Sequence, residues 1–108
     1  MIGNYKEAFP DFGQLDVELP GHLEDVSWGN EPCPCFHSAE ARVFLYVDYA
    51  DKALREFPEM ERFGLQVAAE DGQHVDDESR HLLHTDDFAL VLEKIEARRA
   101  EFSARPAP

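Results

Sequence analysis

Two cysteines and a histidine occupy alternate positions in one short segment, Cys33-Pro34-Cys35-Phe36-His37. Thiolates and imidazoles are the ligands that zinc prefers, and residues two apart in an extended chain project from the same face. The segment therefore predicts a zinc site made by Cys33, Cys35 and His37, with a fourth ligand from elsewhere in the chain. The candidates for this fourth ligand are His22, His74, His81 and His84.

Two other interpretations of these cysteines stay open. Structural zinc sites usually combine two Cys or His pairs, whereas this chain has one pair at a closer spacing. Free cysteines are often small buried hydrophobic residues, and we favour this interpretation, with Phe36 and one cysteine in the core beside Trp28. A redox pair is the third interpretation, although the single proline between the cysteines differs from the two-residue spacer of thioredoxin-type pairs.

A second group of chemically active side chains lies in residues 76–84: Asp76, Asp77, Glu78, His81 and His84. Carboxylates and imidazoles together can hold a divalent cation or activate a water molecule. The spacing does not match a calcium-binding loop, which requires acids at alternate positions and a central glycine. A solvated acidic loop is the simpler interpretation, and a small enzyme built on this segment is the alternative.

Signatures of the common nucleophilic and phosphate-binding enzymes are missing from the sequence. It contains no Gly-x-Ser-x-Gly, no glycine loop followed by Lys-Ser or Lys-Thr, and no His-Glu-x-x-His. We therefore expect a protein without catalysis rather than an enzyme.

Acidic residues outnumber basic residues by 23 to 10, which gives a formal net charge of -13. This charge repels phosphate backbones, so direct nucleic-acid binding is not expected. It allows a partner with a basic surface or imitation of nucleic acid, and a solvated acidic surface that gives solubility is the simpler interpretation. A proline-stiffened loop offers a candidate binding surface formed by Trp28, Asn30, Glu31 and Phe36, because rigid aromatic residues bind with little ordering cost. The simpler interpretation, which we favour, is that Trp28 caps the core and Asn30 holds the turn through its own side chain. The leading hypothesis is a small acidic binding or interaction protein.

The chain of 108 residues predicts one compact domain, residues 1–108, with its own core. The N-terminus lacks the pattern of a signal peptide, and no window approaches the roughly 20 apolar residues of a membrane span. We expect a soluble cytoplasmic protein in which the thiols are free.

Alternating apolar residues predict the strands. Residues 41–49 carry large apolar groups on both faces, which is typical of a central strand, and residues 62–70 alternate as a half-buried antiparallel strand. Shorter strands are predicted near residues 15–19, 22–28 and 80–84. The first part of the chain, residues 1–21, reads as an extended arm packed on the domain.

Residues 85–102 predict one long helix with Thr85 as its N-cap. Its apolar stripe is formed by Phe88, Val91, Leu92, Ile95 and Phe102. The fold class is therefore α+β, with a mostly antiparallel sheet of three to five strands, this helix on one face, and a frayed tail at residues 103–108. One helix leaves the second sheet face uncovered, so a homodimer that hides this face is expected.

Overall fold

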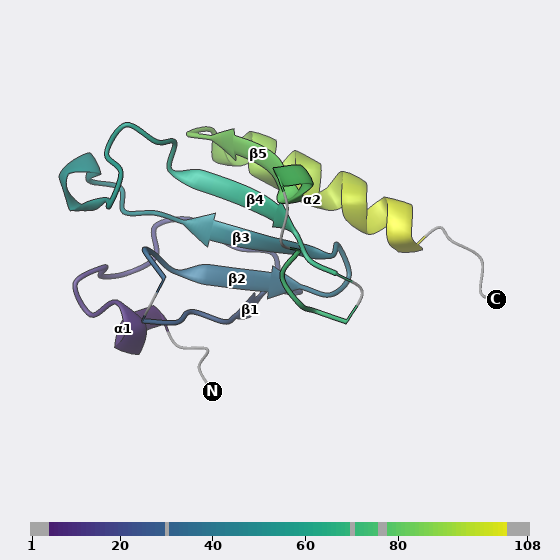
Figure 1. The fold of residues 1–108 in the computed structure, drawn as a ribbon, viewed down its shortest axis with the longest axis horizontal. Helices are drawn as coiled ribbons and strands as arrows, with labels where there is room; N and C mark the ends of the chain where they lie inside the picture. The colour runs from purple at the N-terminus through teal and green to yellow at the C-terminus, as the bar shows by residue number, and fades with distance from the viewer. Residues whose placement is uncertain (1–4, 30, 70, 76–77, 104–108) are drawn as a thin grey trace.

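The computed structural model describes residues 5–29, 31–69, 71–75 and 78–103. Five strands form one antiparallel sheet in the order β1-β2-β3-β4-β5, and a long helix crosses it (Figure 1). The predicted α+β class, with a five-stranded sheet and one long C-terminal helix, is confirmed. The elements are α1 (Tyr5–Ala8), β1 (Glu24–Asp25), β2 (Cys35–Ser38), β3 (Val43–Val47), η1 (Lys52–Leu54), β4 (Phe63–Val67), η2 (Glu78–Arg80), β5 (His81–Thr85) and α2 (Phe88–Ser103).

The strand β3 lies at the centre of the sheet, as its two apolar faces predict. It pairs with β2 through Phe36 opposite Leu45 and with β4 through Leu45 opposite Leu65. These three side chains point to the same face, because directly opposed residues of an antiparallel pair share a side of the sheet. They form the centre of the main hydrophobic core.

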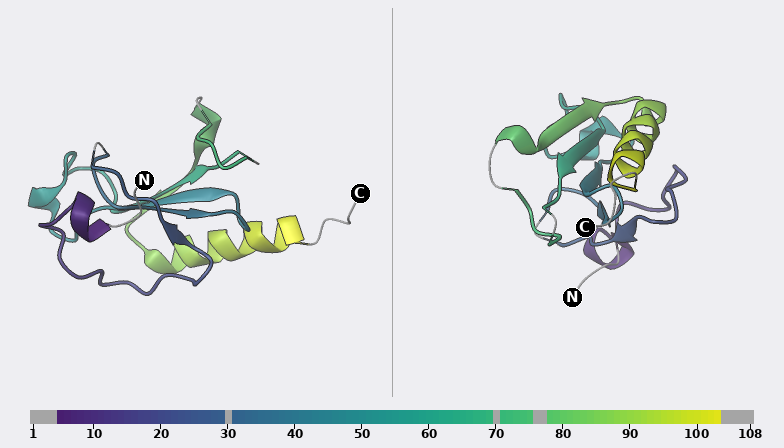
Figure 2. Two further views of the ribbon diagram at one scale, coloured as in Figure 1. Left: turned by 90° about the horizontal axis from the view of Figure 1, so that it is seen from below. Right: turned by 90° about the vertical axis from the view of Figure 1, so that its right-hand side faces the viewer.

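Two segments cover this face of the sheet. Helix α2 contributes Val91 and Ile95, which are fully buried, and the N-terminal arm runs beside it on the same side (Figure 2). The arm packs Leu15, Val17 and Leu19 against the core. It is anchored at its start, where the backbone N–H of Tyr5 donates to the Asp25 carboxylate at 2.7 Å.

The arm begins with the short helix α1 and a turn instead of being extended throughout, and the strand expected at residues 15–19 does not form. The alternation of this segment reflects apolar side chains that rest on the core, without the backbone pairing of a strand. The expected strand at residues 22–28 is reduced to two residues, Glu24–Asp25, at the edge of the sheet. Edge strands in native sheets are often this short.

The helix begins three residues later than expected, and its cap is Asp87 rather than Thr85. The Asp87 carboxylate accepts the N–H of Ala89 at 3.0 Å, whereas the Thr85 hydroxyl accepts the N–H of Asp87 one turn earlier. At the other end, the ring of Phe102 lies under the guanidinium of Arg42 at 4.3 Å instead of in the main core. No helix among the described residues has the length and apolar content needed to cross a membrane.

Substitution of Ile95 by alanine tests how much the contact between α2 and the sheet contributes. Ile95 is fully buried, so the free energy of unfolding is expected to fall by about 2–5 kcal/mol, as for other large core residues. Leu90 on the same helix is 44% exposed, and Leu90→Ala is expected to change stability by no more than about 0.5 kcal/mol. Urea unfolding of both variants measures the difference, and equal losses would contradict this packing.

Candidate functional site on the open face of the sheet

Among the described residues no second layer of helices or strands covers the face of the sheet opposite α2, and we call it the open face (Figure 2). It carries a small second cluster of buried residues, namely Cys35, Phe44 and Ala68, with Val26 and Tyr46 packed at its edge. The ring of His74 stacks on Phe44 with centroids 4.0 Å apart and an interplanar angle of 8°. These contacts cover the part of the open face around Phe44, and the part around Tyr46 and Gly64 stays accessible to solvent.

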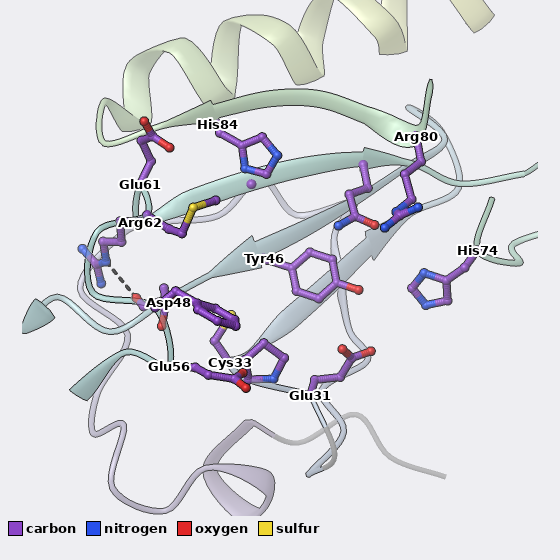
Figure 3. Close-up of a pocket in the computed structure, with 15 residues that line it drawn as sticks. Glu31, Cys33, Tyr46, Asp48, Glu56, Glu61, Arg62, His74, Arg80 and His84 are labelled. Carbon is purple, nitrogen blue, oxygen red and sulfur yellow. Dashed lines mark hydrogen bonds between the residues drawn. The ribbon is translucent and has the colours of Figure 1, made fainter. Parts of the chain in front are cut away.

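A cavity of about 490 Å³ occupies the accessible part of the open face (Figure 3). Three connecting segments surround it. They contribute residues 31–33 before β2, residues 56–57 and 60–62 between β3 and β4, and His74 with Arg80 between β4 and β5. A cavity of this size is within the range of small-molecule or side-chain binding sites.

The floor of the cavity is a row across the middle of the sheet. Tyr46 on β3 pairs with Gly64 on β4, and Gly64 pairs with His84 on β5, so all three face the cavity. Gly64 is the low point of the row because it has no side chain. A Cβ at this position would lie 3.3 Å from the His84 ring, so glycine gives this imidazole its space.

Arg55 positions the segment between β3 and β4 that forms one wall. Its buried guanidinium donates to the carbonyls of Tyr49 at 2.6 Å and Met60 at 3.0 Å, and so ties the two ends of the segment together. The side chains of Phe57 and Met60 are 55% and 44% exposed beside the cavity, and they are carried by this anchored backbone.

Carboxylates dominate one side of the cavity. Glu61, Asp48, Glu56 and Glu31 follow one another around it, while His84, Arg80 and His74 lie on the other side (Figure 3). Burial raises the pKa of Asp48 above its usual range, and this effect outweighs the hydrogen bond that its carboxylate accepts from the N–H of Tyr49. A partly desolvated carboxylate in a pocket gains from a cation placed next to it.

The guanidinium of Arg62, beside Asp48, is already engaged with other groups. Arg62 makes a bidentate pair with the carboxylate of Asp16 at 2.6 and 3.1 Å and donates to the Asp48 backbone carbonyl at 2.9 Å. The pair holds the pKa of Asp16 below its usual value through this hydrogen bond. Arg62 therefore ties the N-terminal arm to the rim of the cavity.

The structure places Cys33, Cys35 and His37 on the open face, as their spacing predicts. Cys33 lines the cavity and is 4% exposed, Cys35 is 2% exposed in the second cluster, and His37 lies against Phe44 with centroids 4.9 Å apart. Burial raises the pKa of Cys33 and also raises that of Cys35, to about 12, so both thiols are protonated at neutral pH. Among the described residues no three Cys, His, Asp or Glu side chains are grouped to hold a metal ion.

The residues of the candidate binding surface separate in the structure. Trp28 is 51% exposed and does not cap the core, and Glu31 lines the cavity, whereas Phe36 is 4% exposed and points into the main core. Asn30 lies outside the described residues. Trp28 and Glu31 are thus the members of this group that the structure leaves accessible.

The acidic segment of residues 76–84 is only partly described, because Asp76 and Asp77 lie outside the described residues. Glu78 is exposed in η2. His81 and His84 both face the open side, with His84 Nε2 and His81 Nδ1 3.2 Å apart. Arg80 and His84 line the cavity.

Tyr46 and Asp48 have the same parity in the segment predicted as the central strand, residues 41–49, but no role was assigned to them from the sequence. Their shared parity was the signal that could have selected them, because the strand is central and its other face is the core. Phe57 and Met60 had no comparable signal, since residues 56–62 have neither a helical nor a strand period.

A Ser-His-Glu arrangement lies at the other side of the molecule. His22 Nδ1 is 2.7 Å from the Ser38 hydroxyl, and His22 Nε2 is 3.6 Å from a carboxylate oxygen of Glu96. The Ser38 hydroxyl is fully buried and accepts the N–H of Ala41 at 3.0 Å. A serine in this position cannot reach a substrate, so the arrangement connects the arm, β2 and α2.

The raised pKa of Cys35 predicts alkaline destabilisation. Its neutral thiol contributes stability that is complete below its ordinary pKa of 9.0 and is lost as the pH rises toward about 12. Cys35→Ala is therefore expected to flatten the loss of unfolding free energy between pH 9 and 11, by at most about 1.4 kcal/mol per pH unit. Denaturant unfolding over this pH range measures both slopes, and identical slopes would exclude this role of Cys35.

Comparison with known proteins gives no relative from which a function could be inferred. No protein-family model, no curated protein and no solved structure matches the chain. The arrangement of its own side chains is therefore the basis for a functional proposal.

Proposed function

We propose that the chain is a binding protein without a catalytic step, and that its open-face cavity receives a cationic segment of a protein partner. The observation that carries this proposal is the row of carboxylates from Glu61 to Glu31 along one side of the cavity. Asp48 lies within this row and is half-buried, with a pKa raised by burial. A lysine or arginine side chain of the partner would restore the interactions that this carboxylate loses on burial.

Exposed apolar side chains support a protein partner over a free cation. Phe57 and Met60 flank the carboxylates and are 55% and 44% exposed, and Trp28 on the loop before Glu31 is 51% exposed. Protein interfaces combine aromatic and Met anchors of this kind with a polar rim. Tyr46 adds an aromatic ring on the cavity floor, where a cation can lie over a ring face.

The net charge of -13 favours a basic partner over a second copy of the same chain. Two copies facing each other through this cavity would bring like charges together, whereas a basic surface gains attraction at long range. The homodimer expected from the uncovered face thus becomes the competing outcome. Light scattering distinguishes the two, since a monomer has a mass of 12.3 kDa.

The other candidate functions gain less support. Zinc binding by Cys33, Cys35 and His37 has less support, because among the described residues no three Cys, His, Asp or Glu side chains are grouped to hold a metal ion. We also propose that the protein is cytoplasmic, because a reducing environment keeps thiols such as Cys33 and Cys35 free.

A peptide of nine arginines is a suitable probe, with binding measured by calorimetry at 25 mM and 0.5 M salt. We expect binding at low salt that weakens strongly at high salt, because exposed charges are screened. The double substitution Asp48→Asn and Glu56→Gln is expected to weaken the low-salt affinity about tenfold, which corresponds to about 1.4 kcal/mol. Phe57→Ser is expected to cause a loss of similar size.

Matched controls lie on the far side of the molecule. Glu93 and Leu90 are exposed on α2, so Glu93→Gln and Leu90→Ser remove a charge and an apolar group without touching the cavity. Both variants are expected to bind the peptide like the unchanged protein. Absence of binding at low salt, or equal losses in the control variants, would show that the cavity does not recognise cations.

A further inference from the structure

Strand β5 carries two imidazoles whose nitrogens point at each other. His84 Nε2 and His81 Nδ1 are 3.2 Å apart, the ring centroids are 5.2 Å apart, and the ring planes are inclined by 43°. The rings therefore meet edge to edge and do not stack. Both residues are exposed, so an ion in solvent can reach the two nitrogens.

A β-bulge brings these two residues to the same side. In a regular strand, residues three apart point to opposite faces, so His81 and His84 would be separated by the sheet. The pairing shifts between Leu65 and Gln66, where Leu65 lies opposite Leu83 and Gln66 lies opposite His81. The extra residue, Leu82, restores His81 to the open face, and bulges of this type often redirect a side chain at a functional site.

Packing on both sides of β5 holds the pair in place. Leu82 and Leu83 both pack against the main core, so the bulge is fixed from below by buried apolar contacts. On the open face the His84 ring lies over Gly64, where an added Cβ would be 3.3 Å from its Nδ1 and Cε1. The Nε2 atom of His84 is thereby directed toward His81 and away from the sheet.

We propose that His81 Nδ1 and His84 Nε2 together bind one late first-row divalent cation, such as Cu²⁺ or Zn²⁺. Two imidazoles on one tetrahedral ion, with bonds of about 2.0–2.1 Å, place their nitrogens about 3.3 Å apart. The observed 3.2 Å separation is close to this value for tetrahedral Zn²⁺, whereas the tetragonal geometry of Cu²⁺ would bring the nitrogens to about 2.9 Å. In either case the two rings must turn so that both lone pairs point at the ion. In the metal-free pair, one of these two nitrogens carries a proton and donates it in a hydrogen bond to the other. When the metal binds, this proton moves to the second nitrogen of the same ring, so both facing nitrogens have a free lone pair for the ion.

The site differs from the sequence-predicted cluster at Cys33, Cys35 and His37, and it does not depend on the proposed function. Imidazole suits copper and zinc without the deprotonation that a thiol requires. Among the described residues no third such side chain is grouped with the pair, so the remaining positions are open to water or another donor. The cation would sit beside the cavity that His84 lines.

Titration of tag-free protein with Cu²⁺ tests the site. Calorimetry measures the affinity and the number of ions bound, and electron paramagnetic resonance counts the nitrogen ligands. Zn²⁺ serves as the competing ion. We expect one equivalent bound, with a spectrum of two nitrogen ligands. His81→Gln and His84→Gln are each expected to weaken binding at least tenfold. His74→Gln removes another exposed histidine of the cavity wall and is expected to leave the affinity unchanged.

Two further variants make the result decisive. Gly64→Ala keeps both imidazoles but crowds the His84 ring, and it is expected to weaken Cu²⁺ binding while thermal unfolding confirms a folded protein. Replacement of Cys33 and Cys35 by serine is expected to leave the metal affinity unchanged. Failure to bind one equivalent at 100 µM protein, unchanged binding in His84→Gln, or loss of binding in the serine variant would each overturn the proposal.

Discussion

The central strand β3 has large side chains on both faces, while the helix and the N-terminal arm cover only one of them. Val43, Leu45 and Val47 are fully buried on the covered face. On the other face Tyr46 and Asp48 lie in the cavity. Antiparallel sheets tolerate one face in contact with water, but a central strand with an aromatic group there needs partial shelter. The three connecting segments supply this shelter and leave a hollow between them.

Three arginines, Arg55, Arg62 and Arg98, donate to backbone carbonyls. Arg55 donates to carbonyls at both ends of the segment between β3 and β4, and Arg98 donates to the carbonyls of Ala41 and Arg42 at 3.0 and 3.2 Å. Arg62 joins the arm to the cavity rim. Arg55 and Arg98 donate to carbonyl oxygens, and Arg62 pairs with Asp16 on the arm, so the carboxylates around the cavity keep a net negative field.

The spacing of apolar residues predicted the strands and the helix that have one buried face. It did not predict which segments pair through backbone hydrogen bonds or which residue caps the helix. Strands β3 and β4 and helix α2 each have a core face that repeats with the period of the element, so their existence followed from the sequence. Residues 15–19 alternate between apolar and polar residues as a strand would, but their apolar side chains pack on the core and their backbone does not pair with a strand. The N-cap was placed at Thr85, with Asp86 and Asp87 expected in the first turn, although aspartate is a better capping residue than threonine.

The same limit explains why part of the candidate site was missed. Parity along β3 was enough to place Tyr46 and Asp48 together, but the imidazole pair depends on a bulge that alternation cannot reveal. Without the bulge, one of the two leucines would turn to the open face and one histidine would turn toward the core beneath α2, at the cost of burying a polar ring. The apolar contacts of Leu82 and Leu83 therefore determine where the imidazoles lie, and the chemistry available on the open face is set by packing on the covered one.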